Sequence, residues 1–324
     1  MKIYITRKIP EAGIKMLQDK GYDVDINPKD KVLSKKELIK ALGKKEYDAV
    51  LCLLTDKIDG DVFNAVPKAK IFANYAVGFD NMDLGAARER NIKVSNTPSV
   101  LTDAVAEHAV ALILAISRRV VEADKFTRAG KYHGWEPMMY LGNSIIGKTV
   151  GILGLGRIGI RVAQILANGF GAKIIYFDIK RNEEFEKEFE KGKVEYKEKM
   201  EDALKESDFI SIHLPLMEST RHILNKERLS LMKKEAYLVN TSRGAVIDEN
   251  ALVKALKDKV IKGAALDVYE NEPVLAKGLA KLDNVVLTPH IASATEEARN
   301  AMSKLAAENI IAVLEGGEAP SLVK

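Results

Sequence analysis

The chain has 324 residues, of which 47% are hydrophobic and 30% are charged, values typical of a globular protein with roughly two domains. Its formal net charge of +4 is small for this length, so the composition gives no support to a nucleic-acid-binding protein. One cysteine, Cys52, excludes an internal disulfide, and no uncharged apolar run approaches the length of about 18 residues that a transmembrane helix needs, so we expect a cytoplasmic protein.

The N-terminal third alternates short apolar runs with helical patterns at residues 11–19, 35–42 and 84–90. Alternation of this kind is typical of βαβ units, so it predicts a parallel sheet. The predicted strands are Lys2–Thr6, Tyr22–Ile26, Ala49–Leu54, Ile71–Asn74 and Ile92–Ser95.

The next segment, Thr102–Val121, is apolar on nearly all sides. A helix with this pattern is buried, and we interpret it as the connection into a second domain.

From Thr149 onward the sequence predicts six strands separated by helices, which is the number in a complete dinucleotide-binding fold. The predicted strands are Thr149–Leu153, Lys173–Phe177, Phe209–His213, Ala236–Asn240, Ala264–Asp267 and Val285–Thr288. The stretch Lys180–Glu206 is dense in lysine and glutamate, and we interpret it as a solvated connection between two strands.

A glycine fingerprint supports the dinucleotide interpretation. Gly154, Gly156 and Gly159 form a G-x-G-x-x-G pattern that directly follows a predicted strand and precedes a helical pattern, and Asp178 ends the next strand. These glycines suit a tight turn, close approach to a pyrophosphate and close helix–strand packing, while the helix N-terminus offers N–H donors to phosphate.

The last helical pattern, Ala294–Leu314, is strongly apolar on one face and therefore needs a partner. The simplest arrangement returns it to the N-terminal domain. We therefore predict a substrate domain formed by residues 1–99 and 292–324, an inserted NAD-binding domain of residues 100–291, and a hinge with a cleft where the chain crosses twice.

Ligands of open α/β sheets bind beyond the carboxyl ends of the strands, so polar residues just after each predicted strand are candidates for the site. Those residues include an arginine, several carboxylates and a histidine, a set that suits hydride transfer to a small carboxylic acid. They are Asp178, His213, Thr241, Ser242, Arg243, Asp267, Glu270, Glu272 and His290.

Each candidate has a chemical interpretation and a structural alternative. Arg243 can bind a substrate carboxylate through its guanidinium fork, or it can form a structural salt bridge. His290 suits general acid/base catalysis, or it packs or caps a turn. A neighbouring carboxylate would raise the pKa of His290, and sequence pattern leaves Glu270 and Glu272 both open for this role.

The acid after the second strand also bears on cofactor choice. Asp178 would bond ribose hydroxyls and repel a 2′-phosphate, which favours NAD(H), whereas Lys180 and Arg181, which follow closely, leave weaker use of NADP(H) open. No spacing of His, Cys, Asp and Glu resembles a zinc site, so we expect no metal.

Five segments of the chain resemble the D-isomer-specific 2-hydroxyacid dehydrogenases, especially the glyoxylate/hydroxypyruvate reductase branch with its archaeal glyoxylate reductases. The matching segments are residues 74–81 (NYAVGFDN), 153–159 (LGLGRIG), 239–244 (VNTSRG), 266–273 (LDVYENEP) and 288–292 (TPHIA).

The resemblance implies two Rossmann-like doubly wound parallel-sheet domains, the substrate domain being flavodoxin-like. It assigns catalysis to Arg243, Glu272 and His290, with Glu272 rather than Glu270 before Pro273. Substrate contacts are expected from Leu53, Val77, Gly78, Arg243 and His290, the backbone N–H groups of Val77 and Gly78 binding the carboxylate. The expected cofactor contacts are Thr102, Gly154, Leu155, Gly156, Arg157, Ile158, Gly159, Asp178, Leu214, Pro215, Thr241, Ser242, Arg243, Asp267, His290 and Ala292.

The resemblance also implies a homodimer with residues 102–121 and the loop around Trp135 at the subunit contact. The expected reaction is reduction of a glyoxylate- or hydroxypyruvate-type 2-oxo acid to a D-2-hydroxy acid, with hydride from NADH and a proton from His290. Alternatives are a 3-phosphoglycerate or D-lactate dehydrogenase and, outside the enzymes, a corepressor-like regulator that senses NAD.

Overall fold

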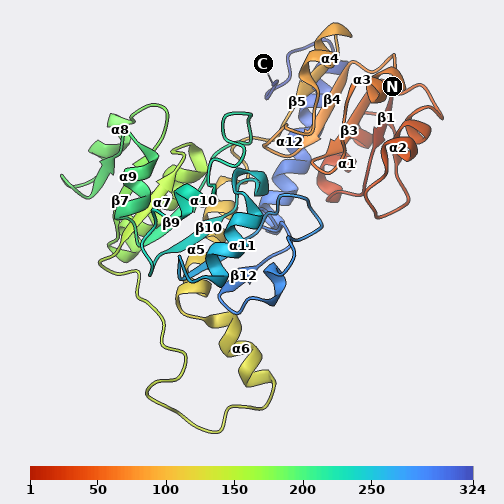
Figure 1. Ribbon diagram of the computed structural model, residues 1–324. Helices are drawn as coiled ribbons and strands as arrows, with labels where there is room; N and C mark the ends of the chain where they lie inside the picture. Colours follow the sequence, from red (N-terminus) through yellow and green to blue (C-terminus); the bar gives the residue numbers. More distant parts are fainter. Residues whose placement is uncertain (324) are drawn as a thin grey trace. The chain divides into compact units, whose positions relative to one another are not determined.

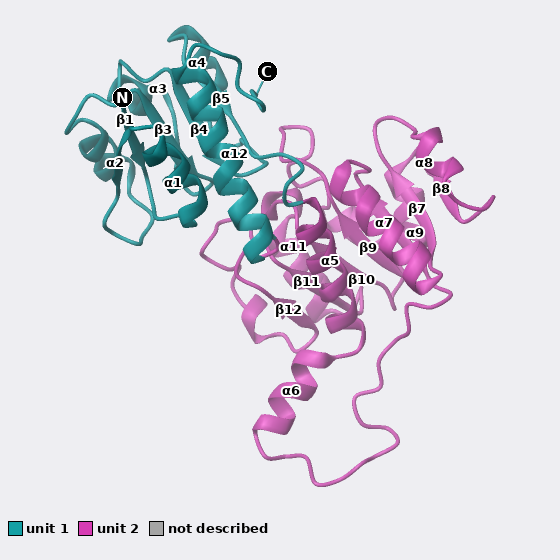
Figure 2. Ribbon diagram, turned by 180° about the vertical axis from the view of Figure 1, so that it is seen from behind, with its two compact units in different colours: residues 1–101, 293–324 teal, residues 102–292 magenta. Residues whose placement is uncertain are grey.

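The computed structural model describes residues 1–323, whose contacts divide into two compact units (Figure 1, Figure 2). Unit 1, teal in Figure 2, holds residues 1–101 and the segment from residue 293 onward, and unit 2, magenta, holds residues 102–292. Within residues 1–323, every helix is too short or too polar to cross a lipid bilayer.

A parallel sheet of five strands forms the centre of unit 1 within the described residues. Its strands lie in the order β2-β1-β3-β4-β5, and each neighbouring pair is parallel. This is the 2-1-3-4-5 order of flavodoxin-like sheets, so the predicted architecture is confirmed. The strands are β1 (Lys2–Ile5), β2 (Asp23–Ile26), β3 (Ala49–Leu53), β4 (Ile71–Tyr75) and β5 (Lys93–Ser95).

The chain's last helix packs on this N-terminal sheet. Helix α12 (Glu296–Leu314) lies against α1 (Glu11–Asp19) and β4. Ser303 on α12 donates a hydrogen bond to the Pro10 carbonyl (2.7 Å) and accepts one from the Gly13 N–H (3.0 Å), so both chain ends build the same unit. The other helices of unit 1 are α2 (Lys35–Leu42), α3 (Gly60–Asn64) and α4 (Leu84–Glu89).

Unit 2 contains a parallel sheet of seven strands within the described residues, in the order β12-β11-β10-β9-β6-β7-β8. The chain builds outward from β6 in one direction and then from β9 in the other, so the loops after β6 and β9 lie where ligands of doubly wound sheets bind. The strands are β6 (Thr149–Leu153), β7 (Lys173–Phe177), β8 (Val194–Tyr196), β9 (Phe209–Ile212), β10 (Tyr237–Asn240), β11 (Gly263–Leu266) and β12 (Val285–Leu287).

The predicted solvated connection at residues 180–206 was wrong. It contains α8 (Glu183–Lys187), the edge strand β8, and α9 (Met200–Glu206). Apolar residues scattered among its charges reach the core, including Phe185, Met200 and Leu204, each at most 2% exposed. Burial of these side chains turns a charged segment into three short elements.

The predicted single helix over residues 102–121 is two helices, α5 (Thr102–Ser117) and α6 (Val120–Arg128). Arg119 between them adopts a left-handed backbone (φ 54°) and forms an ion pair with Glu122 (2.6 Å). Helix α5 packs along α7 (Arg157–Phe170) and the strands β10, β11 and β12, as its apolar surface predicted. The remaining helical elements of unit 2 are α10 (Lys226–Leu229), α11 (Glu249–Lys257), and the 3₁₀ turns η1 (Gly244–Val246) and η2 (Leu279–Lys281).

Candidate active site

The glycine loop after β6 has the geometry of a phosphate-binding turn. Gly154 has a φ of +95°, and a Cβ there would lie 2.7 Å from the His213 carbonyl oxygen. A Cβ at Gly159 would lie 2.1 Å from the Gly154 carbonyl, whereas one at Gly156 would meet nothing within 4 Å. Gly156 is the N-cap of α7 and makes no side-chain hydrogen bond to the helix end. The first N–H groups of a helix are suited to binding phosphate.

Asp178, one residue beyond β7, is tied to this loop. Its Oδ2 accepts a hydrogen bond from the Leu155 N–H at 2.6 Å, which fixes the carboxylate beside the phosphate turn. Of the two basic residues that follow, Arg181 donates two hydrogen bonds to Glu186 (2.9 and 2.6 Å). The guanidinium of Arg181 is therefore held by Glu186, whereas Lys180 is the basic residue closest to Asp178 in the sequence.

His290 and Glu272 form a hydrogen-bonded pair at the carboxyl edge of the sheet. His290 Nδ1 lies 2.8 Å from Glu272 Oε2, and Glu272 Oε1 accepts from the Tyr269 N–H at 3.0 Å. Burial would raise the pKa of Glu272, but its hydrogen bond to His290, the charge of that ring, the Tyr269 N–H and the charge of Arg243 together lower it below the usual range. Glu272 is therefore a carboxylate acceptor, which places the hydrogen on Nδ1 and leaves Nε2 for proton exchange.

The turn that carries His290 is held by Asp267. His290 has a left-handed backbone (φ 56°), and its N–H donates to the Asp267 carbonyl at 2.8 Å. The fully buried Asp267 carboxylate accepts from Thr288 Oγ1 (2.6 Å) and from the N–H groups of Ile291 (2.9 Å) and Ala292 (2.8 Å). Burial alone would raise the pKa of Asp267, but donors that include His108 lower it, so the carboxylate fixes an otherwise unfavourable turn.

Arg243 lies at the same edge of the sheet, three residues after the end of β10. Its carbonyl accepts from Asn240 Nδ2 (2.9 Å), and its own Nη1 donates to the Ser242 carbonyl (2.8 Å). The guanidinium is close enough to Glu272 to help lower the pKa of that carboxyl. The structure therefore brings Arg243, Glu272 and His290 together from three separate loops of unit 2.

The other predicted cofactor residues of unit 2 lie along the same edge. Thr241 Oγ1 is buried and has no hydrogen-bond partner among the described residues, which suits a ligand contact. Leu214 is buried and Pro215 exposed beyond β9, Ser242 donates to Asn240 Oδ1 (2.8 Å), and Thr102 is the half-buried first residue of α5.

His213, for which the sequence allows either packing or a cofactor contact, directly follows β9 and contacts a neighbouring serine. Its Nε2 lies 2.9 Å from Ser211 Oγ, and burial lowers the pKa of His213 to about 3. His222 and Glu270, by contrast, form a pair of their own at 2.7 Å, so the structure separates Glu270 from His290.

Three predicted substrate residues belong to unit 1. Leu53 ends β3, and Val77 and Gly78 follow β4. Among residues 1–323, the N–H groups of Val77 and Gly78 donate to no other group, as a carboxylate-binding pair requires. Their contact with a substrate stays a prediction.

Sequence reasoning missed the asparagines that shape this loop. Asn74 donates to the Gly78 carbonyl (2.9 Å), Asn81 to the Leu53 carbonyl (3.1 Å), and Asn96 to the Val77 carbonyl (2.7 Å). The available signal was an asparagine within an otherwise apolar strand, as at Asn74, because a buried polar side chain needs hydrogen-bond partners.

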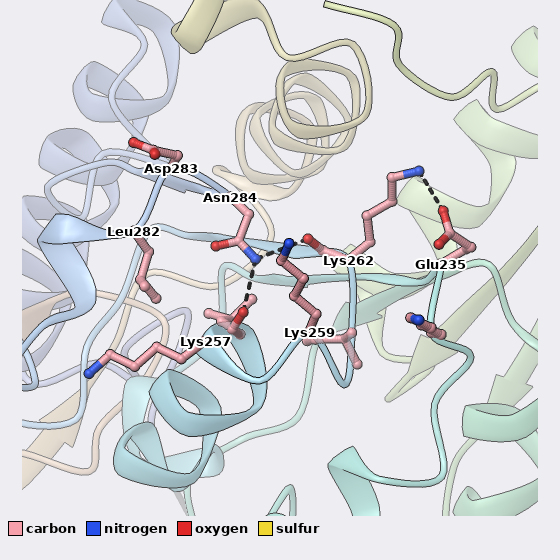
Figure 3. Close-up of a pocket in the computed structure, with 10 residues that line it drawn as sticks. Glu235, Lys257, Lys259, Lys262, Leu282, Asp283 and Asn284 are labelled. Carbon is pink, nitrogen blue, oxygen red and sulfur yellow. Dashed lines mark hydrogen bonds and ion pairs between the residues drawn. The ribbon is translucent and has the colours of Figure 1, made fainter.

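A pocket of about 580 Å³ lies at the opposite edge of the seven-stranded sheet, before β10, β11 and β12 (Figure 3). Lysines line it, and Lys262 forms an ion pair with Glu235 (2.6 Å) while Asn284 donates to the Leu256 carbonyl (3.3 Å). Because ligands of such sheets bind at the carboxyl ends of the strands, we assign no part of the reaction to this pocket. No set of three or more His, Cys, Asp or Glu within the described part of the chain is arranged to hold a metal ion.

Comparison with known proteins places these observations in a family. Residues 110–292 match the family model described as "D-isomer specific 2-hydroxyacid dehydrogenase, NAD binding domain". The chain is 50% identical over 326 aligned residues to the glyoxylate reductase of Thermococcus litoralis, covering 99% of this chain and 96% of the relative. It is 49% identical to the glyoxylate reductase of Pyrococcus horikoshii, covering 99% and 95%.

Solved structures agree with this assignment. The TT0316 protein of Thermus thermophilus has a TM-score of 0.92 at 39% identity, with both chains fully covered. An NADPH-dependent glyoxylate/hydroxypyruvate reductase of Sinorhizobium meliloti, solved with NADP and malonate, has a TM-score of 0.85 at 32% identity, covering 99% of this chain and 96% of that chain.

Proposed function

The chain belongs to the D-isomer-specific 2-hydroxyacid dehydrogenase family, and we propose that it reduces glyoxylate and similar small 2-oxo acids to D-2-hydroxy acids with NAD(H). The observation that carries the proposal is the His290–Glu272 pair beside Arg243 at the carboxyl edge of an NAD-binding sheet. The names of the relatives support glyoxylate as the substrate.

The residues present fit a nicotinamide dinucleotide. The open space at Gly156 and the N-terminus of α7 would hold the pyrophosphate, and the fixed Asp178 carboxylate would accept from ribose hydroxyls. Since Arg181 is paired with Glu186, the residues around Asp178 favour NAD(H) over NADP(H). When bound, the reduced cofactor supplies the hydride.

The protein's own groups then bind the oxo acid and move the proton. The guanidinium of Arg243 binds the carboxylate through two N–H donors, which fixes the position of the carbonyl group. His290 Nε2 donates a proton to the carbonyl oxygen as negative charge develops there, and the Glu272 carboxylate holds Nδ1 and orients the ring. Asp267 maintains the turn on which this histidine lies.

We also propose a cytoplasmic homodimer. Helix α6 and the loop after it expose large apolar side chains, among them Trp135 (81% exposed), Met138 (75%) and Ile146 (72%). A contiguous chain segment with this much exposed apolar surface is typical of a protein interface. Light scattering coupled to size-exclusion chromatography should give the mass of two chains, and a stable monomer would contradict the proposal.

The reaction is tested by following the oxidation of NADH or NADPH, through the absorbance of the reduced nicotinamide, with a panel of oxo acids. We expect turnover with glyoxylate and hydroxypyruvate and a higher kcat/KM with NADH than with NADPH. Preference for pyruvate or for a phosphorylated hydroxypyruvate would favour the D-lactate or 3-phosphoglycerate dehydrogenase alternative. NADH binding without turnover on any acid would support the regulator instead.

A further inference from the structure

A second histidine–glutamate pair lies beside the candidate active site. His222 Nε2 is 2.7 Å from Glu270 Oε1, and Glu270 precedes Glu272 by two residues. The His222 backbone is left-handed (φ 51°), and its N–H donates to the Ala245 carbonyl at 2.8 Å. His222 therefore contacts both the loop that carries Glu272 and the η1 turn that follows Arg243.

Glu270 is also tied to the start of α11. The Glu249 N–H donates to Glu270 Oε2 (3.4 Å), and the Glu270 N–H donates to Glu249 Oε2 (3.3 Å). Glu249 is only 4% exposed, and burial, opposed by backbone donors, raises the pKa of its carboxyl. The two residues thus form a reciprocal tie between the Glu272 loop and the segment just after the Arg243 turn.

The turn after Arg243 and the loop that carries Glu272 are in direct backbone contact near these hydrogen bonds. A Cβ at Gly244 would lie 1.8 Å from the Tyr269 carbonyl carbon and 2.4 Å from the Glu270 nitrogen, so the backbones are in direct contact. Arg243 and Glu272 are each within three residues of this contact. A small shift here would change the separation of the guanidinium from the histidine–glutamate pair.

We propose that His222, Glu249 and Glu270 act as positioning residues, which fix the turn carrying Arg243 against the loop carrying Glu272. The inference rests on the proposed function, because it concerns the distance between the group that binds the substrate carboxylate and the group that donates the proton. None of these three side chains is among the residues expected to contact substrate or cofactor. We expect loss of these contacts to change the position of the bound oxo acid relative to the proton donor. Catalytic rates depend steeply on that geometry.

The central test removes and then restores the tie at Glu270. Glu270→Ala should lower kcat/KM for glyoxylate by about tenfold or more, through both a lower kcat and a higher KM, while the Kd for NADH stays within about twofold. Glu270→Gln keeps the side-chain length and one acceptor oxygen, so it should recover activity to within about threefold of the parent. Glu218→Ala, an exposed glutamate of unit 2, is the matched control and should leave all constants unchanged.

His222→Ala is a second route to the same result, because this side chain is 40% exposed and its loss leaves the core intact. It should lower kcat/KM by about three- to tenfold, and its effect should be less than additive with that of Glu270→Ala, since both break one tie. Activity of Glu270→Ala or His222→Ala equal to that of Glu218→Ala would overturn the proposal, as would a Glu270→Gln variant as impaired as Glu270→Ala. Failure of the parent protein to reduce any oxo acid would instead contradict the proposed function.

Discussion

Two histidine–glutamate pairs lie at the same edge of the seven-stranded sheet and are almost identical as contacts. The His290–Glu272 pair spans 2.8 Å and the His222–Glu270 pair 2.7 Å, and both histidines adopt a left-handed backbone, with φ of 56° and 51°. The glutamates differ in their neighbours: Glu272 is close to Arg243, whereas Glu270 is tied to the buried Glu249. The comparison teaches that a short histidine–carboxylate contact does not define a catalytic group; its surroundings do.

The largest expected effect comes from removing the histidine of the first pair. His290→Ala should lower kcat by about 100-fold or more, because the developing oxyanion then has no positioned proton donor. The Kd for NADH, measured by fluorescence titration, should stay within about twofold. His222→Ala serves as the control from the second pair, and equal losses of kcat in the two variants would remove the distinction drawn between them.

Arg243→Ala tests what makes the neighbourhood of the first pair different. Loss of two charge-assisted hydrogen bonds to the substrate carboxylate should raise KM for the oxo acid by roughly 10- to 100-fold. Arg243→Lys keeps the charge but not the planar fork, so it should recover only part of the loss. Initial rates over a range of glyoxylate at saturating NADH measure both, and an unchanged KM in Arg243→Ala would show that the guanidinium serves structure alone.

The histidine of the first pair could be anticipated from the sequence, whereas strand positions left its partner open between Glu270 and Glu272, and the second pair could not be anticipated at all. Asp178, Arg243 and His290 each follow a predicted strand, and parallel strands place such residues at one edge whatever the loops do. His222 follows no strand end, and its partner Glu270 is 48 residues away, so only the folded loops bring them together. Strand β8 could not be predicted either, because it has only three residues and its few apolar positions lie among charged ones.

The spacing of the glycines allowed the turn after β6 to be predicted from the sequence, and the reason is steric. Gly154 and Gly159 occupy places where a Cβ would meet backbone atoms within 2.7 Å, so the residue type itself records the geometry. The break between α5 and α6 could not be predicted in this way, because the residue with the left-handed backbone there is Arg119 and not a glycine or an asparagine.

Asp178 offers a carboxylate at the same edge that pairs with no histidine. Its Oδ2 accepts from the Leu155 N–H, and we expect it to select the cofactor rather than to act on the substrate. Asp178→Ser should raise the ratio of kcat/KM with NADPH to kcat/KM with NADH by about tenfold, because repulsion of a 2′-phosphate is removed. Glu218→Ala should leave this ratio unchanged, and a ratio unaltered in Asp178→Ser would assign cofactor choice to other residues.

His213 is a histidine that contacts a serine, Ser211, instead of a carboxylate. We expect its titration to affect the stability of the fold and not catalysis. Burial lowers the pKa of His213 to about 3 in the folded protein, while an unfolded histidine titrates near 6.5. Between these values the unfolded chain binds a proton that the folded chain does not, so the stabilisation is complete above about pH 6.5 and is lost as the pH falls toward 3.

The magnitude can be checked by urea unfolding of the parent and of His213→Gln at pH 7 and pH 5. Linkage through this one group should cost the parent about 2 kcal/mol of stability between the two pH values, and the variant should lack that component whatever its stability at pH 7. Catalytic constants at pH 7 should change far less than in His290→Ala, because His213 contacts Ser211 rather than the histidine–glutamate pair. An equal loss of stability in both proteins between pH 7 and pH 5 would mean that His213 is protonated in the folded state, and the contrast with the two paired histidines would then be one of position alone.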